Sequence, residues 1–331
     1  MSRRPGDGTI YVLDQQAAEV RVFDSGGEYL RTIVRRGEGP GEIADANGIL
    51  LSGDTLLWIH DARQRAIIGV DPAGQEVRRF INPVMRYGYI WAGAFDDRGR
   101  YWGPITHRDD EPGYPPPPGL SSWTERHYYK SYELESGATD SVYVGGSGFR
   151  SYAYPTSTGW GFLPLRFEPS RLTAVNPSGG FWNAYTPWYR IARTGESGDT
   201  LVVIEAGLPA QRVTDEDRSA YVESIVRDMP ELRREAEELA ALMPDTKPVL
   251  QGLSVDDEGR LWVERGTPED VPALYDLYSE AGDYLGSVRL AFEAAGPIRV
   301  RHGKIYTWVV DDFDVQYVVR APASLRSELP D

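Results

Sequence analysis

The histidines and the acidic clusters are the residues best able to do chemistry in this chain, and their spacing gives little support for catalysis. His60, His107, His127 and His302 are far apart, and no pair has the four-residue spacing of a helical zinc site. Cysteine is absent, which removes thiol catalysis, thiolate metal ligands and disulfides. We therefore predict no catalytic residue, no metal site and no cofactor.

Two further patterns resemble ligand sites in isolation. Acidic clusters occur at 96–97, 256–258 and 311–314, but none has the spacing of an EF-hand. They lie in predicted turns, where carboxylates accept hydrogen bonds from backbone N–H groups. The run GEGPG at 37–41 follows a strand as a phosphate loop does, yet no Lys-Ser/Thr pair and no helix follow it. We predict a structural role for both patterns.

The composition limits the classes of partner. Fifty acidic and thirty-five basic residues give a formal charge of −15, which disfavours binding to nucleic acids and to anionic lipid surfaces. No segment approaches the roughly 20 apolar residues of a transmembrane helix. The first residues, MSRRPGDG, lack the apolar stretch of a signal peptide. The oligomeric state is left open by the sequence.

The elements that must position any site come from a degenerate internal repeat. A polar turn containing glycine precedes a short strand with a Trp or Tyr in six segments: 7–14, 53–61, 96–104, 176–185, 256–264 and 301–311. Glycine suits tight turns that require a positive φ. Hairpin patterns follow at 20–33, 67–80 and 274–290. Four short strands in each unit of about 40 to 50 residues are typical of a propeller blade.

The repeats predict an all-β fold, a six-bladed β-propeller that occupies residues 1–331 as one domain. The predicted blades are 7–34, 48–80, 89–144, 171–206, 250–290 and 298–320. The first repeat has no inner strand before its turn, and the last has three strands instead of four. We therefore expect that the two ends of the chain pair to close a ring, and that the first blade is truncated at residue 1.

The runs VRVFDSGGEYLRTIVRRGEGPGE (20–42), AVNPSGGFWNAY (174–185) and LSVDDEGRLWV (253–263) resemble bacterial six-bladed propellers with NHL-like repeats. The resemblance covers nearly the whole chain and implies a fold rather than an activity. Such proteins usually carry an export signal before the first blade. The resemblance therefore implies a periplasmic or extracellular location, although the chain as given contains no signal peptide.

Three insertions interrupt the repeat. We predict a stiff, Pro-rich loop at 108–120, with a recognition arm as the alternative. We predict an extra hairpin at 149–167. Over 214–248 the hydrophobic period changes to about 3.6, which predicts two short helices broken near Pro230, with Thr214 as the N-cap. Their apolar stripe should pack on the propeller itself, with partner docking as the alternative; it comprises Leu232, Ala236, Leu239, Ala240 and Met243.

The candidate binding residues lie where the chain enters the innermost strand of the second to sixth blades, or, for the third blade, within that strand. These are Asn47, Trp91, Arg171, Gln251 and Arg299. Two arginines among them disfavour a cation and favour an anionic ligand or a protein carboxylate. The aromatic residues that accumulate between Phe149 and Tyr189 predict packing between blades, with a stacking platform for a sugar or aromatic ligand as the alternative.

Two functional hypotheses follow. The first is a non-enzymatic binding or scaffold propeller that docks a protein partner or a small anionic ligand at the channel mouth, alone or as a subunit of a larger assembly. The second is a metal-dependent hydrolase or lyase of the six-bladed propeller type. The fold alone does not choose between them.

Overall fold

The computed structural model describes residues 8–52, 56–81, 93–111, 113–133, 138–268 and 271–323. The chain divides into two compact units. The first unit comprises residues 1–105 and 130–140, and the second comprises residues 106–129 and 141–331.

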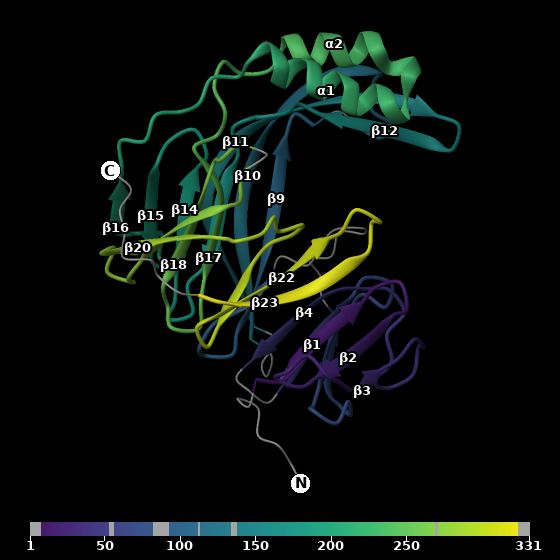
Figure 1. The fold of residues 1–331 in the computed structure, drawn as a ribbon, viewed down its shortest axis with the longest axis vertical. Helices are drawn as coiled ribbons and strands as arrows, with labels where there is room; N and C mark the ends of the chain where they lie inside the picture. Colours follow the sequence, from purple (N-terminus) through teal and green to yellow (C-terminus); the bar gives the residue numbers. More distant parts are fainter. Residues whose placement is uncertain are drawn as a thin grey trace. The chain divides into compact units, whose positions relative to one another are not determined.

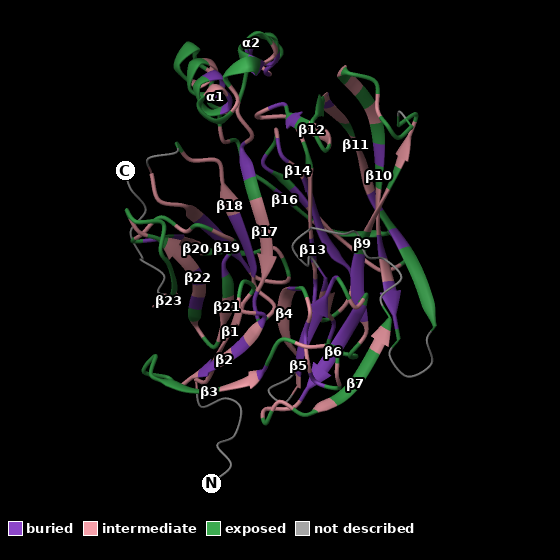
Figure 2. Cartoon of the chain, turned by 90° about the vertical axis from the view of Figure 1, so that its right-hand side faces the viewer, coloured by how far each residue is buried: buried purple, intermediate pink, exposed green. Residues whose placement is uncertain are grey.

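Two antiparallel sheets account for most of the first unit. The first contains β1 (Ile10–Asp14), β2 (Glu19–Phe23) and β3 (Tyr29–Val34). The second contains β4 (Ala46–Ser52), β5 (Leu56–Asp61), β6 (Ala66–Val70) and β7 (Glu76–Ile81). Strand β6, with the sequence AIIGV, is buried along its whole length. Figure 2 shows that burial is concentrated in β5 and β6 of this unit, because both faces of these strands are covered.

A third sheet has five strands in the order β12-β11-β10-β9-β8. They are β8 (Ala94–Phe95), β9 (Tyr101–Asp109), β10 (Gly119–Tyr132), β11 (Thr139–Thr156) and β12 (Gly159–Pro164). The pairing of Ser151 with Pro164 and of Thr156 with Gly159 confirms the extra hairpin and makes it an extension of β11. The Pro-rich segment connects β9 to β10.

Three more sheets belong to the second unit. The fourth contains β13 (Arg171–Val175), β14 (Phe181–Tyr185), β15 (Arg190–Thr194) and β16 (Thr200–Glu205). The fifth contains β17 (Leu250–Val255), β18 (Leu261–Arg265), β19 (Leu274–Tyr278) and β20 (Tyr284–Arg289). The sixth contains β21 (Arg299–Arg301), β22 (Lys304–Val310) and β23 (Gln316–Pro322).

Six antiparallel sheets of consecutive strands thus correspond to the six predicted repeats. The chain is an all-β, six-bladed β-propeller with a short helical insertion, as the sequence predicts. The third sheet is longer than expected, because β11 continues past residue 144 into the hairpin with β12. Within the described residues the first and last sheets have three strands each. The pairing of the chain ends stays a prediction.

The insertion folds as two helices, α1 (Asp215–Asp228) and α2 (Arg233–Ala241), separated by a 3₁₀ turn at Pro230–Leu232. Thr214 caps α1 as predicted: its hydroxyl accepts a hydrogen bond from the Asp217 N–H, and Asp217 accepts one from the Thr214 N–H. The break falls at Pro230 because proline donates no backbone hydrogen bond and starts a new turn.

The predicted apolar stripe of the insertion is buried. Its residues pack with Leu163, Leu165 and partly buried tyrosines of β11, which confirms packing within the chain itself. Figure 1 shows both helices beside β12. Neither helix, nor any other in the described part of the chain, has the length and apolar character that would cross a membrane.

Candidate functional site

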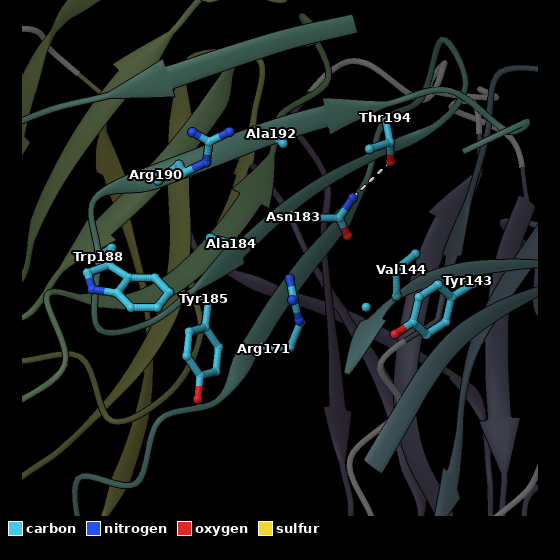
Figure 3. A pocket seen from close by; sticks show the side chains of 11 residues that line it. Tyr143, Val144, Arg171, Asn183, Ala184, Tyr185, Trp188, Arg190, Ala192 and Thr194 are labelled. Carbon is cyan, nitrogen blue, oxygen red and sulfur yellow. Dashed lines mark hydrogen bonds between the residues drawn. The ribbon is translucent and has the colours of Figure 1, made fainter. Parts of the chain in front are cut away.

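A pocket of about 360 Å³ lies in the second unit, between β11 and the sheet of β13, β14 and β15 (Figure 3). Its walls come from β11, from the start of β13 and from the hairpin of β14 and β15. The lining residues are Tyr143, Val144, Gly145, Arg171, Asn183, Ala184, Tyr185, Trp188, Arg190, Ala192 and Thr194.

Strand register brings the pocket residues to one face of the sheet. Arg171 is paired with Tyr185, and Asn183 is paired with Ala192. Paired residues project from the same face, and alternate residues of a strand do so too. Asn183 and Tyr185 are two residues apart on β14, so all four residues share the face that lines the pocket.

Arg171 is held by contacts that leave much of its guanidinium open. Its Nε donates a hydrogen bond of 2.9 Å to the Gly146 carbonyl, and its guanidinium carbon lies 5.6 Å from the centre of the Tyr185 ring. In Figure 3 the side chain lies between Tyr185 and the residues of β11. Among the described residues no carboxylate forms an ion pair with Arg171, and Nε is the only atom of its side chain that forms a hydrogen bond.

Gly145 is required for this placement. Its φ is 127°, and a Cβ there would lie 2.5 Å from the Arg171 side chain. An alanine at this position would therefore be strained in its backbone and would also collide with the guanidinium.

An exposed tryptophan forms one wall of the pocket. Trp188 lies in the turn between β14 and β15 and is 62% exposed. Its ring centre lies 5.4 Å from that of Tyr185, with an angle of 56° between the two planes. By contrast, Trp182 and Tyr189 are buried in a core cluster. The aromatic-rich stretch therefore serves packing at those two positions, whereas Trp188 presents its ring to solvent.

The remaining polar groups of the pocket are largely satisfied. Asn183 Nδ2 donates to Thr194 Oγ1 at 2.9 Å, and Asn183 Oδ1 accepts from Thr173 at 3.1 Å. Arg190 forms an ion pair with Glu205 on the surface. Within the described part of the chain, Arg171 is thus the one uncompensated charge of the pocket.

Of the five residues predicted from the sequence, Arg171 is the one that the structure places in the pocket. Gln251 is exposed at a β-bulge of β17. Arg299 lies at the start of β21, where solvent reaches part of the residue but the surrounding protein desolvates its guanidinium and lowers its pKa. Asn47 lies in the first unit, where its side-chain oxygen hydrogen-bonds His60 Nδ1. Trp91 lies outside the described residues. The convergence of these residues on a channel mouth stays a prediction.

The histidines have other surroundings. Burial lowers the pKa of His60 to about 4, so the ring is neutral at pH 7. His127 Nε2 lies 2.9 Å from Ser147 Oγ, and His302 Nδ1 lies 3.1 Å from Asp257. In the ranges that the structure describes, no three His, Asp or Glu side chains are grouped so that they could hold a metal ion.

Comparison with known proteins supports the fold. Residues 5–79 match the model of a family described as a 6-bladed beta-propeller (DUF5128). No curated protein matches the sequence.

Three solved structures are similar to the chain over most of its length. A putative exported protein from Bacteroides fragilis is 11% identical, with 91% of this chain and 77% of that chain covered and a TM-score of 0.46. Virginiamycin B lyase from Staphylococcus aureus is 11% identical, with coverage of 98% and 84% and a TM-score of 0.40. The calcium-binding protein regucalcin from Agrobacterium tumefaciens is 10% identical, with coverage of 95% and 86% and a TM-score of 0.40. These similarities are too low to carry a ligand or an activity over to this chain.

Proposed function

We propose that this propeller is a non-enzymatic binding protein that holds a small anionic ligand in the pocket around Arg171. The observation that carries the proposal is the open guanidinium edge of Arg171, which has no carboxylate partner among the described residues. A guanidinium presents paired N–H donors that match a carboxylate or a phosphate in two parallel hydrogen bonds.

The electrostatics of the chain favour a local anion site over general anion binding. The formal charge of −15 repels anions at long range, so attraction must come from close contact with Arg171. The cavity volume of about 360 Å³ lies at the small end of the range for small-molecule pockets. A carboxylate of a protein partner would make the same contact with Arg171. Titration with small anions and with an acidic peptide separates these two kinds of ligand.

The test is a calorimetric titration of the purified chain with small carboxylates and phosphates, repeated with Arg171→Ala. Losing a charged hydrogen-bond partner should weaken binding about ten- to hundredfold. The matched control is Arg234→Ala, because Arg234 is exposed on α2 and does not line the pocket. Equal affinity of wild type and Arg171→Ala for every anion would refute the proposed site.

Two further outcomes separate this proposal from the alternatives. Binding of an acidic peptide without any binding of small anions would favour a docking role. A stoichiometric divalent ion in the purified protein, together with hydrolysis that a chelator abolishes, would favour the metal-dependent enzyme.

A further inference from the structure

We infer that the ligand of this pocket is an aromatic carboxylic acid with a single negative charge; this inference rests on the proposed anion site at Arg171. Three features of the pocket carry it: its charge, the orientation of its open donors, and its exposed aromatic wall.

The charge of the pocket favours a monoanion. Arg171 contributes one positive charge without a partner among the described residues, whereas Glu205 compensates Arg190. A dianion would keep one negative charge unpaired in a protein that already carries a formal charge of −15. A singly charged carboxylate is the anion that the pocket neutralises in full.

The donors of Arg171 are oriented before any ligand binds. The hydrogen bond from Nε to the Gly146 carbonyl and the contact with the Tyr185 ring fix the plane of the guanidinium. The edge formed by the two terminal nitrogens is left open. That edge matches the two oxygens of a carboxylate in a bidentate pair. Little side-chain entropy is lost on binding, since the side chain is already held.

The aromatic wall of the same pocket suits a flat ring. Trp188 exposes its ring, and the Tyr185 ring meets it at 56°, so the two form a corner. A ligand ring that stacks on Trp188 would turn its edge toward Tyr185, and aromatic groups favour both arrangements. The small side chain of Ala192, paired with Asn183, leaves room on the same face. A neutral sugar could stack on Trp188 too, but it would not use the open edge of Arg171.

Four probes separate the charge from the ring. Benzoate has both, cyclohexanecarboxylate has the charge on a ring without π electrons, benzamide has the aromatic ring without the charge, and phenyl phosphate carries a second charge. We would titrate each into the full chain by calorimetry. We expect benzoate to bind about two- to tenfold more tightly than cyclohexanecarboxylate. We also expect it to bind more tightly than benzamide and more tightly than phenyl phosphate.

Variants tie each preference to a residue. Trp188→Ala should remove the preference for benzoate over cyclohexanecarboxylate, while the matched variant Trp188→Phe retains it. Arg171→Gln should abolish binding of both carboxylates. Thermal unfolding of each variant shows whether it is folded, and the exposure of Trp188 makes its replacement mild for stability.

The outcomes distinguish this inference from the proposed function. If benzoate and cyclohexanecarboxylate bind equally in wild type, or if Trp188→Ala leaves the preference intact, the aromatic class is wrong while the anion site stands. Tighter binding of phenyl phosphate would overturn the monoanion argument. Failure of both carboxylates to bind wild type, or unchanged binding in Arg171→Gln, would overturn the site itself.

Discussion

Asn176 Nδ2 donates a hydrogen bond of 3.0 Å to Glu280 Oε1, which joins the turn after β13 to the turn after β19. The corresponding turn residue of the fifth sheet is Asp256, whose Oδ2 accepts from Trp262 Nε1 at 2.8 Å and from Arg260 Nε at 2.7 Å. Asp96 makes the equivalent bonds after β8. The acidic turns at 96 and 256 therefore have the structural role that the sequence predicts.

The fourth sheet differs because Asn176 stands where the other two turns have aspartate, and the carboxylate at this turn belongs to Glu280 of another turn. Glu280 forms an ion pair with Arg193, and the neutral amide of Asn176 donates a hydrogen bond to Glu280. Gly180 stands at the position that Arg100 and Arg260 occupy in the other two turns. Trp182 Nε1 has no hydrogen-bond partner among the described residues. An amide fits beside Glu280, where a second carboxylate would repel it.

We expect Asn176→Asp to lower the free energy of unfolding by about 1–2 kcal/mol, because it replaces a donor with a like charge. The cost should be smaller in a Glu280→Gln background, where the new carboxylate can pair with Arg193 and accept from Trp182. Urea unfolding of the four proteins in this cycle measures the coupling. An identical cost of Asn176→Asp in both backgrounds would contradict the account.

The helical insertion gives a second prediction. Leu239 is 1% exposed and packs in the cluster between the helices and the β11–β12 hairpin. We expect Leu239→Asp to lower the free energy of unfolding by about 2–4 kcal/mol, since it removes apolar contacts and buries a charge. Leu242, three residues on, is 42% exposed and provides the control, because Leu242→Asp should change stability little. Equal effects of the two substitutions in urea unfolding would refute intramolecular packing of the stripe.

Much of the fold could be predicted from the sequence because its signals are local. A glycine turn before a strand with an aromatic residue specifies a hairpin within a dozen residues, and six such turns mark six sheets. The helices follow equally from Thr214, Pro230 and a 3.6-residue period. The extra hairpin was predicted too, but its fusion with the third sheet through one continuous strand, Thr139–Thr156, was not, because a strand pattern does not specify whether two consecutive β-segments are joined without a break.

The candidate site was predictable at one position. Arg171 follows from its place at the start of a predicted inner strand. Gly145 and Tyr143 were missed, because the pocket forms where β11 packs beside β13, and strand pattern does not specify which sheets face each other. The sequence does not single out Trp188 from the other aromatic residues between Phe149 and Tyr189, which are predicted to pack between blades. Its place in a turn after Pro187 is the signal that distinguishes it from the core aromatics.

Stability should depend on pH through His60. Burial lowers the pKa of this ring from an ordinary 6.5 to about 4, so the unfolded chain binds more protons than the folded chain between these values. The stabilising contribution of neutral His60 is complete above pH 6.5 and is lost as the pH falls toward 4. It is of the order of 3 kcal/mol.

The measurement is urea unfolding at pH 7.5 and near pH 4.5 for wild type and His60→Gln, which has no ionisable ring. We expect the variant to lose less stability than wild type between these two conditions. His107→Gln, at an exposed position of β9, should keep the wild-type pH dependence. An unchanged slope in His60→Gln would show that other groups govern acid unfolding.

Two glycines of β11 provide the last prediction. Gly145 has a φ of 127° and would place a Cβ 2.5 Å from Arg171, whereas a Cβ at Gly148 would meet no atom within 4 Å. We expect Gly145→Ala to lower the free energy of unfolding by about 1–3 kcal/mol and to displace the guanidinium from the Gly146 carbonyl. Anion affinity should then fall along with stability, since the open edge of Arg171 loses its orientation.

Gly148→Ala should leave anion binding as it is in wild type. Calorimetric titration at a temperature where both variants are folded compares their anion affinities. If Gly145→Ala kept the full anion affinity of wild type, the anion would not bind through the oriented guanidinium of Arg171.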